Sequence, residues 1–340
     1  MTIGPAAVRE AAGHHGRGDV ALAVRGLSVD FATRRGPLPA VVDVDLDVSR
    51  GELVALLGES GSGKSVTARA VMGLVPDNGA LRARELRLGD TDLLTAGPEE
   101  LRGLRGRRMS LVFQDALSAL NPVLSIGDQI GELLRAHADV SRRQTRRRAE
   151  ELLGLVGIPD PGRRCGDYPH QFSGGMRQRI LIAMAIALEP ELLIADEPTT
   201  ALDVTVQAQV LELVDRLRRE LDMGVLLITH DLGVVCEVAD RVTVMYAGRI
   251  VEHGDGDDVL TRPAHPYTRA LMHSVPQAEG LGRDLLAIPG SPPNQASLPT
   301  GCAFHPRCTF TVERCRDTRP ELRDLGGRGA ACHRAEEVLS

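Results

Sequence analysis

The sequence predicts a mixed α/β fold built around a phosphate-binding loop. From residue 20 to about residue 247, short aliphatic runs typical of strands alternate with helical patterns. Residues 58–65 read GESGSGKS and lie between an aliphatic run at 53–57 and a helical pattern at 66–72. A second aliphatic run, at 192–195, ends in two acids. These three observations indicate a nucleotide-binding core that uses a metal ion.

Residues 58–65 match the G-x-x-x-x-G-K-[ST] pattern of a phosphate loop. The glycines allow backbone N–H groups to turn inward, and the following helix adds the positive end of its dipole. Lys64 is the one lysine of the chain and provides a compact charge for the β- and γ-phosphates. The flanking strand and helix disfavour a chance glycine-rich turn. The residues expected to hold ATP are Gly58, Ser60, Gly61, Gly63, Lys64 and Ser65.

The composition narrows the class of protein. A chain of 340 residues fits one large domain or two smaller ones. Aromatic residues make up 2% of it, which disfavours stacking platforms for single-stranded nucleic acid. The net charge of -6 disfavours DNA binding. The longest apolar run, at 180–188, is too short to cross a bilayer. We therefore expect a cytosolic chain, or one bound to a partner that spans the membrane.

The chain divides into three parts. Residues 1–19 lack periodicity and are expected to form a disordered tail. Residues 20–261 form the nucleotide-binding domain, with a mostly helical subdomain at about 115–175. Residues 262–340 are rich in Pro, Gly and Cys and form a C-terminal extension. An arginine run at 141–148 could bind nucleic acid or anionic lipid, but it continues into a helical pattern and favours a solvated helix face.

Two further segments suggest catalytic roles. Asp196 ends a strand and is placed to hold Mg²⁺ together with the hydroxyl of Ser65. Glu197 follows it and can orient or deprotonate a water molecule at the γ-phosphate. Ser173, Gly174 and Gly175 begin an apolar helix and could form a second anion site, one that serves the nucleotide of a partner. An ordinary serine helix cap is the alternative.

With these motifs in this order, residues 20–260 resemble the ATP-binding cassette family. Residues 173–178 are similar to its signature motif, with Met176 where many members have Gln. The resemblance implies a mixed sheet core, an antiparallel β subdomain and a helical subdomain. It also assigns roles to residues that spacing alone leaves open, namely Gln114 as a contact of Mg²⁺ and water, Asp203 in a loop at the dimer interface, and His230 as the switch histidine.

The resemblance implies a mechanism. Two cassettes close head to tail around two ATP molecules, each lying between the phosphate loop of one chain and the Ser173 motif of the other. Glu197 then positions water and His230 contacts the γ-phosphate. The family stacks an aromatic ring on adenine, and Phe31 is the candidate, although residues 33–40 look like an inserted hairpin turn.

Three segments resemble the oligopeptide/dipeptide importer branch, namely YPHQFSGGMRQR at 168–179, DEPTTALDVTVQ at 196–207 and HPYT at 265–268. This resemblance implies a peripheral position on the cytoplasmic face of the cell membrane. It also implies a second ATPase that is homologous but not identical, two permeases and, indirectly, an extracytoplasmic binding protein. Importers of nickel and other small solutes share these motifs, so the cargo stays open.

The extension contains Cys302, Cys308, Cys315 and Cys332, with five, six and sixteen residues between them. Four cysteines in a segment too small for its own core suggest a metal centre. The spacing matches neither zinc nor ferredoxin patterns, and leaves zinc, iron–sulfur and free thiols open. Some members of the resembled branch carry a [4Fe–4S] cluster in a similar tail, which favours that cluster. Cys165 and Cys236 are expected to be buried thiols.

Two other classes of ATPase share the same cassette motifs. A soluble DNA-repair ATPase with the same cassette would need long inserted arms between Gln114 and Ser173, and the segment there is too short. A regulatory cassette that binds ATP without turnover would lack a catalytic acid or switch histidine, but Glu197 and His230 are both present.

Overall fold

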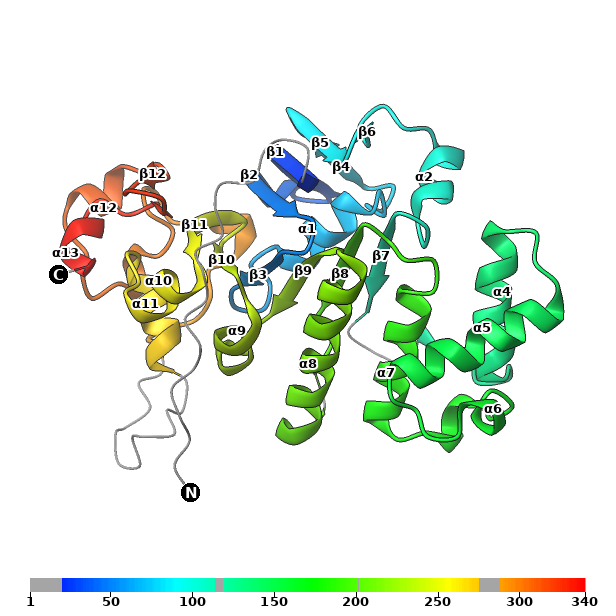
Figure 1. Ribbon diagram of the computed structural model, residues 1–340. Coiled ribbons are helices and arrows are strands. Elements are labelled where there is room, and N and C mark those ends of the chain that lie inside the picture. The colour runs from blue at the N-terminus through cyan, green and yellow to red at the C-terminus, as the bar shows by residue number, and fades with distance from the viewer. Residues whose placement is uncertain (1–19, 114–118, 201, 275–287, 340) are drawn as a thin grey trace, which may run out of the picture.

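The computed structural model describes residues 20–113, 119–200, 202–274 and 288–339 (Figure 1). At its centre lies a mixed sheet of strand order β12-β13-β11-β10-β3-β9-β8-β7. Five consecutive strands of this sheet, from β10 to the edge strand β7, run parallel, as in nucleotide-binding α/β domains. They are β3 (Leu53–Leu57), β7 (Met109–Val112), β8 (Leu192–Asp196), β9 (Gly224–Thr229) and β10 (Arg241–Tyr246).

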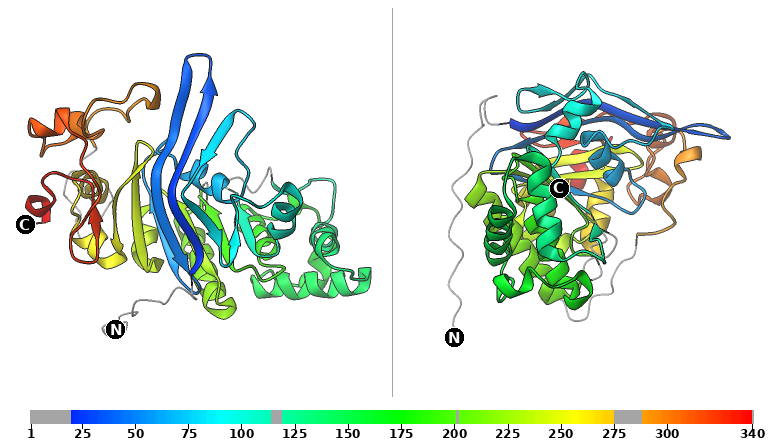
Figure 2. Two further views of the ribbon diagram at one scale, coloured as in Figure 1. Left: turned by 90° about the horizontal axis from the view of Figure 1, so that it is seen from above. Right: turned by 90° about the vertical axis from the view of Figure 1, so that its right-hand side faces the viewer.

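A second, antiparallel sheet covers one face of the first, and its long β1–β2 hairpin projects from the molecule (Figure 2). Both strands of the hairpin alternate buried and exposed side chains over much of their length, as expected of a sheet with one wet face. The predicted mixed core and antiparallel β subdomain are therefore confirmed. The strands are β1 (Val20–Thr33), β2 (Gly36–Ser49), β4 (Gly79–Arg82), β5 (Glu85–Leu88) and β6 (Thr91–Asp92).

Helices occupy both sides of the parallel strands. α1 (Lys64–Val71) packs between the two sheets, and α7 (Gly174–Ala185), α8 (Val204–Leu221) and α9 (Leu232–Val238) lie on the opposite face (Figure 1). α2 (Pro98–Leu104) precedes β7. A group of helices at the far right of Figure 1 matches the position expected for a helical subdomain; it comprises α4 (Ile126–His137), α5 (Arg142–Leu155), α6 (Pro161–Arg164) and η2 (Pro169–Gln171).

The core follows the alternation of side chains along the strands. All five residues of β3 are buried. Val54 and Leu56 face the antiparallel sheet and α1, whereas Leu53 faces the layer of α7 and α8. The arginine run lies on α5, where Arg146 and Arg147 pair with the glutamates four residues on, each at 3.1 Å between nitrogen and oxygen. This is the solvated helix face that the sequence favoured.

The C-terminal extension packs on the edge of the main sheet. β13 (Gly329–Ala330) pairs with β11 (Arg249–Asp255), and β12 (Arg323–Asp324) pairs with β13. Phe304 packs against Tyr246 of β10 and Tyr267 of α11, so the extension shares a hydrophobic cluster with the cassette. α10 (Gly256–Thr261) immediately precedes the extension. The helical elements of the extension are α11 (Pro266–His273), η3 (Gln295–Ser297), η4 (His305–Arg307), α12 (Arg314–Asp317) and α13 (Ala335–Leu339).

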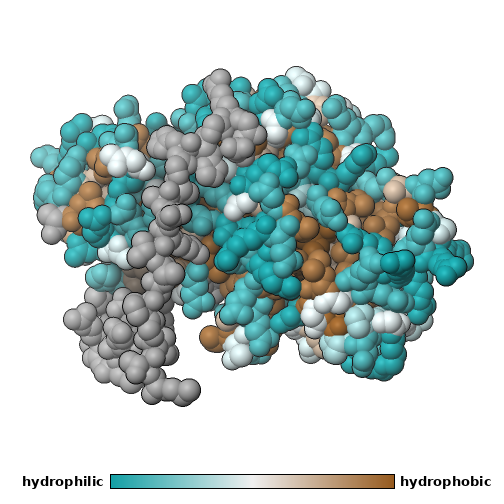
Figure 3. Space-filling view, viewed as in Figure 1, coloured by the Kyte–Doolittle hydropathy of each residue, from teal (hydrophilic) through white to brown (hydrophobic). Residues whose placement is uncertain are grey.

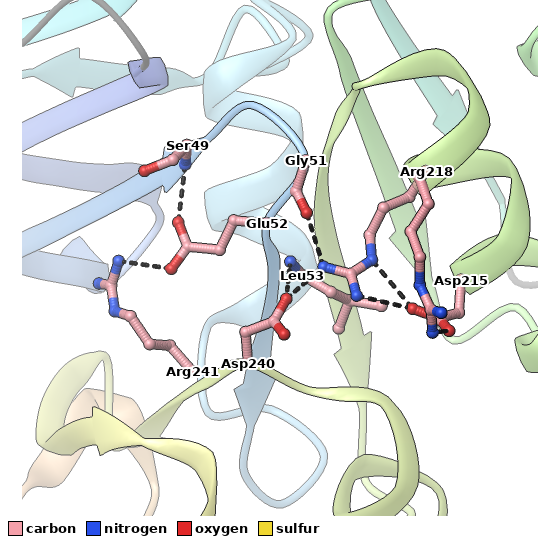
Figure 4. A network of polar contacts seen from close by, with 9 residues as sticks. Ser49, Gly51, Glu52, Leu53, Asp215, Arg218, Asp240 and Arg241 are labelled. Atoms are coloured by element: carbon pink, nitrogen blue, oxygen red, sulfur yellow. Dashed lines mark hydrogen bonds and ion pairs between the residues drawn. The ribbon is translucent and has the colours of Figure 1, made fainter. Parts of the chain in front are cut away.

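A buried arginine ties α8 to the amino end of β3 (Figure 4). Arg218 is 5% exposed and donates to the carbonyl of Gly51 at 2.7 Å, to Asp215 and to Asp240. Asp240 also accepts from the backbone N–H of Leu53 at 2.8 Å. Because a buried charge is costly unless it is paired, this network fixes the helix on the sheet.

Candidate ATP site and comparison with known proteins

The predicted phosphate loop follows the carboxyl end of β3 and leads into α1. Gly58 and Gly63 have φ angles of 151° and 111°, which side chains rarely tolerate. A Cβ atom would lie 2.2 Å from the carbonyl of Met245 at Gly58, and 2.7 Å from the carbonyl of Ala40 at Gly63. The glycines are therefore required by close backbone approach as well as by the turn.

Lys64 lies inside this loop and is 4% exposed. Its Nζ donates to the carbonyls of Gly58 and Glu59, at 2.6 and 2.9 Å. Burial lowers the pKa of Lys64, and the carboxylates of Glu197, Asp196 and Glu59 oppose that shift. The ammonium group is thus directed into the loop and surrounded by negative charge.

Ser65 and Asp196 meet across the loop. The hydroxyl of Ser65 donates to Asp196 at 2.9 Å, from the start of α1 to the end of β8. Burial raises the pKa of Asp196, and the hydrogen bond from Ser65 acts in the opposite direction. A hydroxyl and a carboxylate, both oxygen ligands of the kind that Mg²⁺ prefers, therefore lie together at the partly buried carboxyl end of β8.

Glu197 and His230 form a second pair, from the ends of the neighbouring strands β8 and β9. His230 Nδ1 lies 3.3 Å from Glu197 Oε1, and Thr200 donates its hydroxyl hydrogen to Glu197 Oε2 at 3.0 Å. Glu197 has a φ of 49°, in the left-handed region that is uncommon for residues with a side chain. Such strain often accompanies a functional position, because the surrounding structure must hold it.

The loop, Glu197 and His230 line one cavity of about 880 Å³, which is large enough for a nucleotide. Asp196 is not on its wall and reaches the site through its hydrogen bond with Ser65. The sequence did not predict that the C-terminal part of the chain also lines the cavity. No local pattern marks this, because these residues follow the loop by more than two hundred positions. The predicted residues on its wall are Gly58, Ser60, Gly61, Gly63, Lys64, Ser65, Glu197 and His230; the additional ones include Leu271, Ile288, Pro292, Gln295 and Arg307.

Other predicted site residues lie apart from this cavity. Ser173 and Gly174 are exposed at the start of α7, where the Ser173 hydroxyl accepts from Met176 N–H as a helix cap. Asp203 likewise caps α8, accepting from Val206 N–H at 3.0 Å. Phe31 does not line the cavity, since its ring packs against the apolar layer between the sheets and beside Gly79. Gln114 lies outside the described residues.

Gly175, the last residue of the predicted signature glycines, is also absent from the cavity wall. A Cβ atom added there would lie 2.5 Å from the side chain of Val206 on α8. Close packing between α7 and α8 therefore explains why glycine occupies position 175 in this chain.

The four cysteines of the extension line one small cavity, together with His265, His305 and His333. Burial raises the pKa of Cys302 to about 11 and that of Cys332 to about 12, so both thiols stay protonated at neutral pH. Within the described ranges, no group of three or more His, Cys, Asp or Glu side chains is arranged to hold a metal ion. Cys165 is buried as predicted, but the prediction for Cys236 was wrong, because α9 leaves it exposed.

Comparison with known proteins gives the family. The family model "ABC transporter" matches residues 41–200, and "Oligopeptide/dipeptide transporter, C-terminal region" matches residues 251–315. The chain is 50% identical over 300 residues to the dipeptide transport ATP-binding protein DppD of Bacillus subtilis, covering 88% of this chain and 90% of the relative. This chain belongs to the oligopeptide/dipeptide branch of ABC transporter ATPases. The oligopeptide transport ATP-binding protein AppD of Bacillus subtilis is 47% identical to this ABC ATPase, over 93% of this chain and 97% of AppD.

Solved structures give the same fold. The cassette MJ0796, described as a dimeric bacterial ABC transporter cassette, aligns with a TM-score of 0.61 and 26% identity over 69% of this chain and 98% of that chain. A second structure of it is described as a post-hydrolysis state bound to ADP and Pi. In the described part of this ABC ATPase, none of the helices has the length and hydropathy needed to cross a membrane.

Proposed function

We propose that this chain hydrolyses ATP to drive the import of dipeptides or oligopeptides through a membrane assembly. The observation that carries the proposal is the meeting of a phosphate loop and the Glu197–His230 pair at one cavity, where Ser65 of the loop also binds Asp196. The family and its C-terminal region support the cargo, since the relatives with that region are named for dipeptide or oligopeptide transport.

ATP would bind with its phosphates against the loop amides and the ammonium of Lys64. The hydroxyl of Ser65 and the carboxylate of Asp196 suit Mg²⁺, which prefers oxygen ligands, and the ion would neutralise charge that develops on the phosphates. A cation there would also favour the ionised form of Asp196, whose pKa burial raises. Gln114 is proposed as a further contact of this metal.

Glu197 would hold the attacking water and accept its proton. Thr200 and His230 contact the two oxygens of its carboxylate, which restricts the orientation of that carboxylate. His230 would contact the γ-phosphate from the neighbouring strand. Positioning of this kind accounts for most of catalysis in phosphoryl transfer, where the protein does little covalent chemistry.

A second ATPase chain would complete each nucleotide site. Ser173, Gly174, Gly175 and Asp203 lie apart from this chain's cavity, and Ser173 and Asp203 are at exposed helix starts, as a role toward a partner's nucleotide requires. Val204, next to Asp203, is 82% exposed and is therefore accessible to a partner chain. The partner is proposed to be homologous but not identical. Phe31 remains the proposed adenine contact and would have to reach the base from outside the present cavity wall.

Two permease subunits would bind where apolar side chains gather between α2 and the helical group (Figure 3). Phe113, at the end of β7, is 49% exposed, and Val123, before α4, is 76% exposed. Docking on permeases would place this chain on the cytoplasmic face of the membrane as a peripheral subunit. An extracytoplasmic binding protein would act indirectly, and no nucleic acid is involved.

The extension beyond residue 261 is proposed to be a distinct unit that carries a [4Fe–4S] cluster on its four cysteines. The shared cavity supports this, because all four cysteines line it. Binding would have to displace thiol protons and turn the side chains toward a common centre, because no such group is preformed among the described residues. Iron and acid-labile sulfide in anaerobically purified chain, lost in Cys308→Ser, would support the cluster. Stoichiometric zinc, or no metal, would contradict it.

ATP turnover by the purified chain tests the function directly. We expect Mg²⁺-dependent release of phosphate that Lys64→Ala abolishes, because the loop then lacks its one ammonium group. An inactive wild-type chain together with retained dimer formation would instead favour a regulatory cassette.

A further inference from the structure

The C-terminal extension makes a direct ionic contact with the phosphate loop. Glu59 is the second residue of the loop, and Arg307 ends η4. The two guanidinium nitrogens Nη1 and Nη2 of Arg307 donate to the two carboxylate oxygens of Glu59, at 2.6 and 2.9 Å. This fork geometry is the strongest and most directional form of a salt bridge.

Arg307 is held firmly in place. Its side chain is 5% exposed, and that of Glu59 is 24% exposed. Nε of Arg307 donates to the carbonyl of Pro289 at 2.9 Å, and the guanidinium lies 6.0 Å from the ring centre of Tyr246. On the loop side, the backbone N–H of Glu59 donates to the hydroxyl of Tyr267 at 2.8 Å. Both the side chain and the backbone of Glu59 are thus bound by residues outside the loop.

The charge of Glu59 bears on ATP binding. Glu59 and Arg307 both line the cavity, and the negative charge of Glu59 acts on Lys64. An unpaired carboxylate at this position would repel a triphosphate bound to the same loop. A loop that binds polyanions therefore needs this carboxylate to be neutralised or turned aside.

We propose that Arg307 is a positioning residue for ATP binding, which neutralises Glu59 and holds it away from the phosphates. The extension would then contribute to the nucleotide site of its own chain, in addition to any part it has in assembly. This inference rests on the ATP site proposed above, and it predicts that damage to η4 weakens ATP binding without altering the catalytic pair.

The test is the dissociation constant of Mg-ATP for the full-length chain and three variants, measured by calorimetry. Arg307→Gln should weaken binding about tenfold, within the usual range of roughly 5- to 150-fold for coupled sites. Glu59→Gln should bind at least as tightly as wild type, because the repelling charge is gone. Adding Glu59→Gln to Arg307→Gln should restore most of the lost affinity, because the carboxylate that repels the phosphates is then gone.

Arg323→Gln is the matched control. Arg323 makes a similar forked pair in the same extension, with Glu336 at 3.0 and 3.1 Å, but lies outside the cavity wall. The Arg323→Gln variant should bind ATP as wild type does. A double variant as weak as Arg307→Gln, or a Glu59→Gln variant that loses affinity, would overturn the proposal. If Arg307→Gln fails to fold, the dissociation constant of Mg-ATP for Glu59→Gln still tests the proposal. Failure of the wild-type chain to bind ATP would instead reject the proposed function.

Discussion

Replacing Glu197 by Gln should stop ATP hydrolysis while leaving ATP binding intact. Thr200 and His230 hold the carboxylate at 3.0 and 3.3 Å, and an amide of the same shape can keep the Thr200 contact. The amide cannot accept a proton from water. A positioned base contributes about 10²- to 10⁴-fold to the rate, so the barrier should rise by about 3 to 5 kcal/mol.

The assay is phosphate release at saturating Mg-ATP, with ATP binding and ATP-dependent dimerisation measured on the same preparation. Glu197→Gln should bind ATP as well as wild type and accumulate as a closed dimer, because hydrolysis no longer releases it. Glu189→Gln is the matched control, since this exposed glutamate pairs with Arg148 away from the site and should keep full activity. A Glu197→Gln turnover within about tenfold of wild type would refute the role of Glu197 as base.

Three further predictions concern other parts of the chain. Ser173→Arg should bind ATP as a monomer but fail to form ATP-dependent dimers in size-exclusion chromatography; normal dimers would reduce Ser173 to a helix cap. Arg218→Met should lower the free energy of unfolding by about 3 to 5 kcal/mol in denaturant titrations, because Asp215 and Asp240 lose their buried partner, whereas the exposed Arg219→Met should cost at most about 1 kcal/mol. Burial lowers the pKa of His265 to about 3. The free energy of unfolding should therefore be unaffected by this histidine above about pH 6.5 and should fall by about 1.4 kcal/mol per pH unit from there toward pH 3, because the unfolded chain takes up a proton that the folded chain does not. The free energy of unfolding of His265→Gln should fall less steeply with pH, and an equal slope would count against a buried neutral histidine.

Local patterns predicted the catalytic core because each of its parts is encoded within a few residues. The loop at 58–65 needs its glycines for backbone geometry and its Lys64 for charge, and both requirements are visible in the sequence. Asp196 ends a buried strand and His230 directly follows one, and a buried parallel strand can be identified from an unbroken aliphatic run.

What sequence patterns did not predict depends on packing between distant segments. Arg307 meets Glu59 across 248 positions, and nothing in the local sequence of either residue indicates the other. Strand pairing directs the ring of Phe31, the proposed adenine contact, to the layer between the sheets, a placement that no local pattern indicates. Cys236 was expected to be buried because it lies within the core region of the chain, yet its side chain is exposed on α9.

The central claim is that ATP hydrolysis at this cavity drives peptide import. Uptake of a labelled dipeptide and a labelled oligopeptide into vesicles that carry the complete importer tests it most directly. We expect ATP-dependent uptake of at least one peptide with the wild-type chain and none with Glu197→Gln, although both assemblies form. Peptide uptake that persists with Glu197→Gln, or ATP-dependent uptake of Ni²⁺ in place of either peptide, would contradict the account.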